Sequence, residues 1–252
     1  MSETLHTVVR RETWGEEFGQ SGWITAPEQD GFIQLLGLKP GQALLDIGCG
    51  SGGPLLRFVQ RTGITAHGID VQKDGIATAR RQAEERKLID RATFEVCDAT
   101  GSLPFGDDSF DAVMSVDAIS HMPNRAKVLT EWGRVIKTGG KLLFTNASVL
   151  TGEATHEELS IRGAFGLQVY VAPGIDERAI ESAGLNVIVK EDTTDQVANV
   201  ARRWHEARGK REAELREVEG NDAFERLQRF LAVASQLAHE RRLCRYTYVA
   251  GK

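Results

Sequence analysis

Leu44-Leu45-Asp46-Ile47-Gly48-Cys49-Gly50-Ser51-Gly52-Gly53-Pro54 joins an apolar run to a cluster of glycines. An acidic residue, Asp70, follows twenty positions after Gly50. A strand that enters a tight glycine turn and then a helix N-terminus is typical of sites that hold nucleotide-like ligands. The stretch therefore predicts a strand, a ligand-binding turn and a helix, and the remaining sequence has to indicate which ligand binds there.

The composition limits the class of protein. The chain has 252 residues, 41% hydrophobic and 27% charged, which is ordinary for a globular protein. A net charge of −5 argues against a nucleic-acid partner, because phosphate binding needs clustered Lys and Arg. No apolar run approaches the roughly 20 residues of a membrane span, and Met1-Ser2-Glu3-Thr4 starts no secretion signal. We therefore expect a single cytoplasmic domain over 1–252, with neither membrane nor nucleic acid as partner.

The three cysteines, Cys49, Cys97 and Cys244, are too few and too scattered for a disulfide framework or a metal site. We expect buried free thiols. No His, Asp or Glu grouping shows the spacing of metal ligands either, so the sequence predicts no metal.

Strands and helices alternate through the first half of the chain. Apolar runs predict strands over 43–47, 64–70, 92–97, 110–116 and 141–146. Helical spacing of apolar residues predicts helices over 52–60, 73–87 and 125–136. This alternation predicts a mainly parallel sheet covered by helices on both faces.

The two ends of the chain are less regular. Helices are predicted over 8–19 and 31–38, and 147–174 reads as irregular with one helix. The C-terminal part predicts a helix over 175–183, a strand over 186–191, a charged helical region over 195–240 with a break at Gly220-Asn221, and a strand over 244–249. Because no regular crossover unit precedes the last strand, we expect it to pair antiparallel.

The glycine turn alone leaves two ligands open. Gly48, Gly50 and Gly53 satisfy G-x-G-x-x-G, and Asp70 lies where a ribose-binding acid belongs. By spacing, an NAD-dependent oxidoreductase is therefore one interpretation.

Two carboxylates favour a different ligand. Asp46, two positions before the first glycine, repels a pyrophosphate but suits a cationic ammonium group. Cys97-Asp98-Ala99 follows the third predicted strand, where a carboxylate can accept a hydrogen bond from the exocyclic amine of adenine. An adenosine ligand that also carries an ammonium group fits both positions.

These residues stand in the order of a known family. The motifs are Leu45-Asp46-Ile47-Gly48-Cys49-Gly50-Ser51-Gly52, Gly68-Ile69-Asp70, Asp98-Ala99, Leu103-Pro104-Phe105, Phe110-Asp111 and Leu129-x-Glu131-x-x-Arg134-Val135-x-Lys137-x-Gly139-Gly140. Together they resemble a class I S-adenosylmethionine-dependent methyltransferase of the bacterial small-molecule type. The resemblance covers residues 40–147 and implies an α/β, Rossmann-like, doubly wound, seven-stranded and mostly parallel sheet, with an antiparallel last strand and a helical lid insertion.

The resemblance also implies a cofactor site for S-adenosyl-L-methionine within a cofactor-binding core over 40–147. Gly48 and Gly50 would let the backbone approach the methionine part closely, where a Cβ would collide. Asp70 would accept both ribose hydroxyls. The full set is Asp46, Gly48, Gly50, Asp70, Val71, Gln72, Asp98, Ala99 and Val116.

The acceptor side is expected after the fourth and fifth strands. Asp117 and His121 are the candidates for catalysis, because methyl transfer to a nucleophile of high pKa needs a general base. The expected substrate-binding residues are Ser120, Asn146, Tyr170 and Trp204.

Three segments are expected to close over the acceptor. They are an N-terminal lid over 1–30, which contains Trp14, Phe18 and Trp23, and two insertions over 148–174 and 195–240. Trp204 lies on an otherwise charged helical stretch, and the roof of the pocket is the natural partner for its ring. The mixed charges of 202–219 predict a solvated helix face.

We therefore expect methyl transfer to an oxygen or nitrogen of a small heteroaromatic or phenolic metabolite, as in bacterial secondary metabolism. A small-amine or quinone-ring C-methyltransferase is the nearest alternative. An NAD-dependent oxidoreductase and a non-catalytic methyltransferase-like binding protein are alternatives from other classes. The small-molecule acceptor is the expected partner of a monomer or homodimer.

Overall fold

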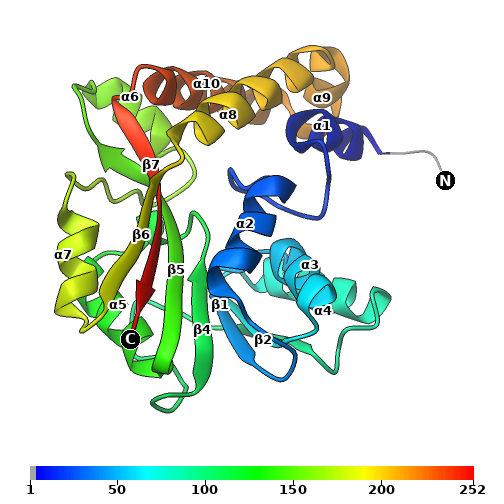
Figure 1. The fold of residues 1–252 in the computed structure, drawn as a ribbon. Coiled ribbons are helices and arrows are strands. Elements are labelled where there is room, and N and C mark those ends of the chain that lie inside the picture. Colours follow the sequence, from blue (N-terminus) through cyan, green and yellow to red (C-terminus); the bar gives the residue numbers. More distant parts are fainter. Residues whose placement is uncertain (1–3) are drawn as a thin grey trace.

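Residues 4–252 are described by the computed structural model, which contains one seven-stranded sheet with helices on both sides (Figure 1). Residues 1–3 of the expected N-terminal lid lie outside the described residues. The strands are β1 (Ala43–Ile47), β2 (Thr65–Asp70), β3 (Ala92–Val96), β4 (Phe110–Ser115), β5 (Ile136–Leu150), β6 (Asn186–Asp192) and β7 (Leu243–Gly251).

The sheet confirms the predicted topology. Its order is β3-β2-β1-β4-β5-β7-β6, and β1 to β5 pair in parallel. β7 lies between β5 and β6 and is antiparallel to both. The antiparallel last strand was expected, and the α/β fold class is confirmed.

The helices are α1 (Leu5–Trp14), α2 (Ala26–Leu36), α3 (Gly53–Thr62), α4 (Lys73–Glu85), α5 (Arg125–Val135), α6 (His156–Arg162), α7 (Ile175–Ser182), α8 (Thr194–Gly209), α9 (Glu212–Glu219) and α10 (Asn221–His239), with a 3-10 turn, η1 (Ile119–His121). Helices α2, α3 and α4 pack on one face of the sheet, and α5 and α7 pack on the other.

The two faces follow from the alternation of side chains along each strand. In β1, Leu44 belongs to the core beneath α2, α3 and α4, whereas its neighbour Leu45 belongs to the core beneath α5 and α7. Both side chains are fully buried. Successive strand residues point to opposite faces, so a continuous apolar run predicts a strand that is covered on both sides.

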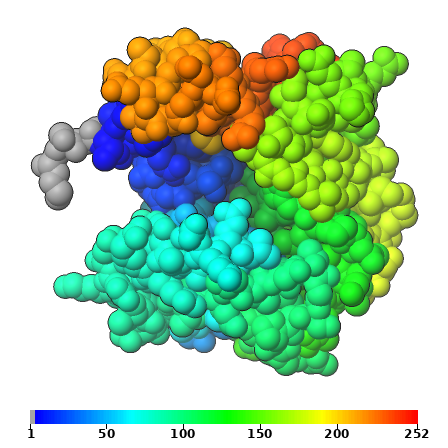
Figure 2. Space-filling model, turned by 180° about the vertical axis from the view of Figure 1, so that it is seen from behind, coloured from blue at the N-terminus to red at the C-terminus, as the bar shows by residue number. Residues whose placement is uncertain are grey.

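Helices α1, α6, α8, α9 and α10 form a layer over one end of the sheet, which we call the lid layer (Figure 1). It has its own apolar core, in which Trp14, Trp23, Val200 and Leu231 are buried. The rings of Trp14 and Trp204 lie 4.9 Å apart and join α1 to α8. Seen from behind, the surface is hollowed between this layer and the α3–α4 side of the sheet (Figure 2).

Two N-terminal helix boundaries were predicted wrongly. The helix expected over 8–19 is α1, which ends at Trp14 because Gly15 adopts a left-handed φ of 79°. The helix expected over 31–38 is α2, which begins at Ala26. Pro27 lies in its first turn, where a missing N–H costs nothing, and that start signal was overlooked.

Later boundaries differ for similar local reasons. The helix stop expected at 138–140 lies inside β5, where Gly139 has a φ of 79° and the register with β4 shifts between Phe110 and Ala112. The single helix expected within 147–174 is α6. The break at Gly220 is confirmed, and a second break, which was not predicted, separates α8 from α9 at 210–211.

Candidate functional site

A cavity of about 550 Å³ lies between the turn after β1 and the lid layer. This size falls within the roughly 300–1,000 Å³ of small-molecule sites. It is lined by Ser21, Gly22, Trp23, Gly48, Gly50, Ser51, Asp70, Gln72, Gly75, Val116, Asp117, Ala118, Ser120, His121, Ala147, Arg162, Phe165, Gly166, Gln168, Trp204, Leu227 and Phe230. One continuous space therefore joins the glycine turn to the aromatic residues of the lid layer.

The glycine turn is fixed by the backbone of the neighbouring strand. The N–H groups of Gly48 and Cys49 both donate to the carbonyl of Ile69, at 2.8 and 3.1 Å. Gly48 has a φ of 76°, and a Cβ at this position would lie 2.4 Å from the Cβ of Ala118. Only glycine fits, and the reason lies in the protein itself, before any ligand is considered.

Gly53, the third glycine of the pattern, has a different role. A Cβ there would lie 2.2 Å from the carbonyl oxygen of Phe18. The first turn of α3 is thus packed directly on the N-terminal segment. This glycine ties the segment before α2 to the cofactor turn.

Asp70 lies at the end of β2 and lines the cavity. Its Oδ2 accepts the N–H of Gly50 at 2.9 Å, and its Oδ1 accepts the N–H of Gln72 at 2.8 Å. A carboxylate oxygen can accept more than one hydrogen bond, so both oxygens keep acceptor capacity for a diol. Gln72 lines the same wall.

Asp46 lies beneath the glycine turn and does not line the cavity. Burial, with the nearby charge of Asp70, raises the pKa of Asp46 to about 7. Burial likewise raises the pKa of the Cys49 thiol, which is inert as a nucleophile. All three cysteines are free thiols; Cys49 and Cys244 are buried as expected, whereas Cys97 is only half-buried.

Besides Asp46, three more of the expected cofactor residues do not reach this cavity. Val71 is 60% exposed beside Asp70, which leaves an apolar side chain open at the edge of the site. Asp98 is exposed, and it accepts hydrogen bonds from the N–H and Oγ1 of Thr100, which lower its pKa. Ala99 is buried in the core beneath α5. Val116, in contrast, lines the cavity as expected.

Asp117 was expected to bind or deprotonate the acceptor, and the geometry corrects this role. Its Oδ1 accepts from Arg245 Nε at 2.7 Å and from Thr145 Oγ1 at 2.8 Å. Its Oδ2 accepts the N–H of Trp23 at 3.0 Å. A carboxylate held by a buried guanidinium and two further donors is not available as a base.

Asp117 is instead part of a buried ion triad. Arg245, on β7, is fully buried and pairs with both Asp117 and Glu28 on α2. The triad joins the N-terminal segment, the loop after β4 and the last strand. A lone arginine in an otherwise apolar strand pattern was the sequence signal for it, and it was missed.

His121, at the end of η1, is exposed to the cavity. Its Nδ1 lies 2.6 Å from the carbonyl oxygen of Leu167. Because a carbonyl only accepts, Nδ1 carries the proton and the neutral ring keeps its lone pair on Nε2. The ring is held in the tautomer that a general base needs.

Two of the four expected substrate-binding residues line the cavity, and the other two do not. Ser120 and Trp204 line the cavity. Asn146 is fully buried behind it and donates to Asp176 at 2.6 Å. Tyr170 donates its hydroxyl to the carbonyl of Leu159 at 3.0 Å, and burial raises its pKa. The structure therefore brings Ser120 and Trp204 to the site and leaves Asn146 and Tyr170 in its supporting wall.

Several lining residues were not assigned from the sequence. They are Arg162, Phe165 and Gln168 from the insertion expected over 148–174, and Leu227 and Phe230 from the insertion expected over 195–240. The Trp23 ring stacks on Phe230 at 6.1 Å and 9°, and Phe165 meets Phe230 edge-on at 5.1 Å. No local pattern brings these positions together, since they come from α6, the loop after it, α10 and the segment before α2.

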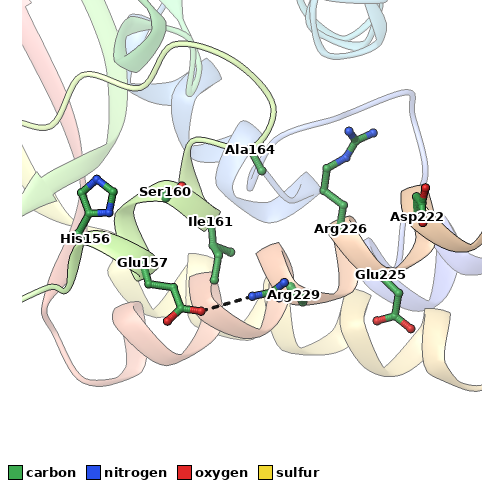
Figure 3. Close-up of a pocket in the computed structure, with 9 residues that line it drawn as sticks. All are labelled: His156, Glu157, Ser160, Ile161, Ala164, Asp222, Glu225, Arg226 and Arg229. Carbon is green, nitrogen blue, oxygen red and sulfur yellow. Dashed lines mark hydrogen bonds and ion pairs between the residues drawn. The ribbon is translucent and has the colours of Figure 1, made fainter.

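A second hollow of about 720 Å³ lies on the outside of the lid layer, between α6 and α10 (Figure 3). Figure 3 shows the pair of Glu157 and Arg229, 3.4 Å apart, bridging the two helices. The residues that line this second hollow are polar or charged, except Ile161 and Ala164, and none of them comes from the glycine turn. The smaller cavity, which the glycine turn lines, is therefore the candidate functional site.

The part of the chain that the structure describes contains neither a metal-ligating cluster nor a membrane-spanning helix. In residues 4–252, no group of three or more His, Cys, Asp or Glu side chains could hold a metal ion. Within the same residues, no helix has the length and apolar character that crossing a membrane requires.

Known proteins share both the sequence pattern and the fold. A family model described as a methyltransferase domain matches residues 45–144. Methyltransferase GfsG of Streptomyces halstedii is 30% identical over 169 residues, which cover 65% of this chain and 59% of the relative. The 27-O-demethylrifamycin SV methyltransferase of Amycolatopsis mediterranei (strain S699) is 29% identical over 241 residues, 89% of this chain and 87% of the relative.

Among solved structures, phosphoethanolamine N-methyltransferase 2 of Haemonchus contortus, in complex with S-adenosyl-L-methionine, superposes with a TM-score of 0.84 at 23% identity. The match covers 99% of this chain and 57% of that one. The chain thus spans 57–59% of the length of two of these three proteins and 87% of the third. Sequence motifs, family match and fold agree, and the chain belongs to the class I S-adenosylmethionine-dependent methyltransferases.

Proposed function

We propose that this protein transfers the methyl group of S-adenosylmethionine to an oxygen or nitrogen atom of a small acceptor with a flat, apolar or aromatic body. The observation that carries the proposal is the single cavity. It joins Asp70 and the glycine turn, which suit an adenosine ligand, to His121 and the aromatic side chains of the lid layer. Cofactor and acceptor would meet inside it, away from bulk water.

The residues present fit the cofactor in the order that the family suggests. Asp70 would hold the ribose hydroxyls with the acceptor capacity left on its two oxygens. The backbone at Gly48 and Gly50 would face the methionine part, and Val71 would cover the adenine edge with its exposed side chain. Bound there, S-adenosylmethionine supplies an electrophilic methyl group on sulfur.

His121 is the residue to which we assign proton removal. Its Nε2 lone pair would take the proton of a phenolic hydroxyl or an amine as the oxygen or nitrogen bonds to the methyl carbon. The carbon–sulfur bond breaks in the same step, and S-adenosylhomocysteine is the second product. The name of the Amycolatopsis relative, which gives an O-demethylated acceptor, supports oxygen over carbon.

The lid layer is proposed to exclude water rather than to react. Residues 4–30, 148–174 and 195–240 supply Trp23, Phe165, Trp204 and Phe230 to the wall opposite the glycine turn. Desolvation strengthens the electrostatic contacts of the reacting groups. We propose a cytoplasmic enzyme acting on a soluble metabolite, with a small amine as the alternative acceptor.

The test combines cofactor binding with turnover. Calorimetric titration should show tight binding of S-adenosylhomocysteine and none of NAD. Release of S-adenosylhomocysteine should then be followed over matched phenols, anilines and aliphatic amines. Binding without turnover on any acceptor would favour a non-catalytic binding protein.

The same assay tests the base. His121→Ala should lower kcat by about 10²–10⁴-fold for a phenolic acceptor, because the variant lacks the imidazole to which proton removal is assigned. His156→Ala is the matched control, since His156 is exposed in the second hollow, between α6 and α10 (Figure 3). Full kcat in the His121 variant at saturating substrate would remove the base from the mechanism.

A further inference from the structure

One buried charge in the cavity has no counterion. Arg162, the last residue of α6, is 5% exposed and lines the acceptor end of the cavity. Its guanidinium lies 4.7 Å from the ring centre of Phe230 and 5.7 Å from that of Trp23. The two rings are nearly parallel, and both belong to the wall on which an acceptor would pack.

The aromatic rings do not satisfy the hydrogen-bonding groups of Arg162. Ring faces stabilise a cation through their negative potential, but a guanidinium also has five N–H donors. Among residues 4–252, no carboxylate lies within ion-pairing distance of this side chain, and its Nε has no hydrogen-bond partner. Asp117, which contributes attraction at longer range, is already paired with Arg245 at 2.7 Å.

The other buried arginines of the described chain are different. Arg57, Arg125, Arg208 and Arg245 each pair with at least one carboxylate, at 2.5–3.4 Å for the closest contacts. Burying a charge without a partner is costly, which explains that pattern. Arg162 is the exception, and it is the one that faces the ligand cavity.

The charge is retained despite burial. Desolvation lowers the pKa of Arg162 to about 10, so the guanidinium stays protonated at neutral pH. Its donors are therefore available for an anion that enters with the substrate. A guanidinium binds the two oxygens of a carboxylate in a fixed planar arrangement.

We propose that Arg162 is the anchor for a carboxylate carried by the methyl acceptor, whose apolar body packs on Trp23, Phe165 and Phe230. This assignment rests on the proposed function, because it names the acceptor of the same site. One unpaired guanidinium matches the single charge of a carboxylate. A phosphate monoester, with a charge of about −1.5 to −2, would call for a second cation.

The anchor also gives the acceptor a direction. Arg162 belongs to the lid layer, whereas His121 follows β4 beside the glycine turn, and both line the same cavity. An acceptor held by its carboxylate at Arg162 could therefore present a second polar group, its hydroxyl or amine, to His121.

The experiment uses two probes of the same shape, 4-hydroxybenzoate and 4-hydroxybenzamide, and phenyl phosphate as the phosphate probe. Each is titrated by calorimetry into the full-length protein saturated with S-adenosylhomocysteine. The wild type should bind 4-hydroxybenzoate at least tenfold more tightly than the neutral amide. Arg162→Met should abolish that preference, and Arg162→Lys, which keeps the charge without the planar pair of donors, should keep part of it.

Arg226→Met is the matched control. Arg226 is an exposed arginine on α10, 5.5 Å from the centre of the Phe165 ring, and it lines the second hollow, between α6 and α10 (Figure 3). The control should keep the full preference of the wild type for the carboxylate. Loss of the preference in Arg226→Met as well as Arg162→Met would indicate general surface charge and would overturn the assignment.

The outcomes separate this inference from the proposed function. Failure of S-adenosylhomocysteine to bind contradicts the proposed function. If S-adenosylhomocysteine binds normally but 4-hydroxybenzoate binds no more tightly than 4-hydroxybenzamide, or does not bind, only the carboxylate anchor is overturned. Phenyl phosphate binding tenfold more tightly than 4-hydroxybenzoate overturns the choice of carboxylate. If Arg162→Met does not fold, a wild-type preference that is weakened in Arg162→Lys supports the anchor, and an unchanged one opposes it.

Discussion

The two ends of the cavity are built in different ways. The cofactor end uses backbone and side chains from Gly48 to Gln72, a span of 25 residues that begins directly after β1 and includes β2. The acceptor end uses long side chains from four separate segments, with Trp23, Arg162, Trp204 and Phe230 as examples. A site made by neighbouring loops tolerates little change in backbone. A site made by distant side chains depends on how whole helices pack.

From this difference we expect the largest loss of stability from a substitution that breaks long-range contacts between segments. Arg245→Met leaves the Glu28 and Asp117 carboxylates buried without their cation, which should lower the free energy of unfolding by about 3–5 kcal/mol. Urea denaturation measures this. The control is Arg202→Met, which breaks an exposed pair with Glu206 and should cost less than about 0.5 kcal/mol. Equal losses in the two variants would show that the triad does not hold α2 and the loop after β4 to the last strand.

At the cofactor end, Asp46 should make stability depend on pH. The pKa of Asp46 is about 7 in the folded protein, whereas its ordinary value is 3.8. Between these two pH values the folded state keeps a proton on Asp46 that the unfolded state has lost. The contribution of Asp46 to stability is then full below about pH 4 and is lost as the pH rises to about 7. At about 1.4 kcal/mol per pKa unit, the total change reaches up to about 4 kcal/mol.

The comparison for Asp46 is Asp46→Asn, which should remove this pH dependence. The variant should be more stable than the wild type at pH 8 and equal to it near pH 4, as measured by urea denaturation at a series of pH values. If the free energy of unfolding depends on pH in the same way in both proteins, the prediction is wrong, and the ionised Asp46 carboxylate is well solvated in the fold. Weaker binding of S-adenosylhomocysteine by the variant at pH 8 would link the carboxylate to the ammonium group.

Asp70→Ala should weaken binding of S-adenosylhomocysteine by about 2–3 kcal/mol, because a charged acceptor of hydrogen bonds is lost. Calorimetry measures the change. Asp98→Ala is the comparison, since Asp98 is occupied by Thr100 and lies outside the cavity, and its loss should stay below about 1 kcal/mol. A larger effect for Asp98 than for Asp70 would mean that the adenine contact, and not the ribose contact, dominates the cofactor end.

Much of the sheet and of the cofactor end could be predicted from the sequence. The run Leu44–Ile47 indicates a doubly covered strand because alternate residues are apolar on both faces. Gly48 and Asp70 fall where the pattern placed them, since each acts through groups within one βαβ unit. Asp98 does not reach the cavity, because Thr100, two residues further on, is a closer partner for its carboxylate.

The acceptor end was much harder to predict. Tyr170 and Asn146 were expected there but are hydrogen-bonded inside the supporting wall. Asp117 was expected as a catalytic group, but it is paired with an arginine 128 residues away in the chain. No periodicity or spacing reports on a contact of that range.

The sequence by itself determined the sheet, the antiparallel last strand and the turn that faces the cofactor, because strand alternation and glycine turns are fixed by interactions between near neighbours. Only the tertiary structure decided that Arg162 is buried without a counterion among aromatic rings, and that Asp117 is a structural partner of Arg245. Those environments arise where α6, α10 and the N-terminal segment meet β7 and the glycine turn. The electrostatic state of a side chain is set by what surrounds it in space, and here the surroundings come from every part of the chain.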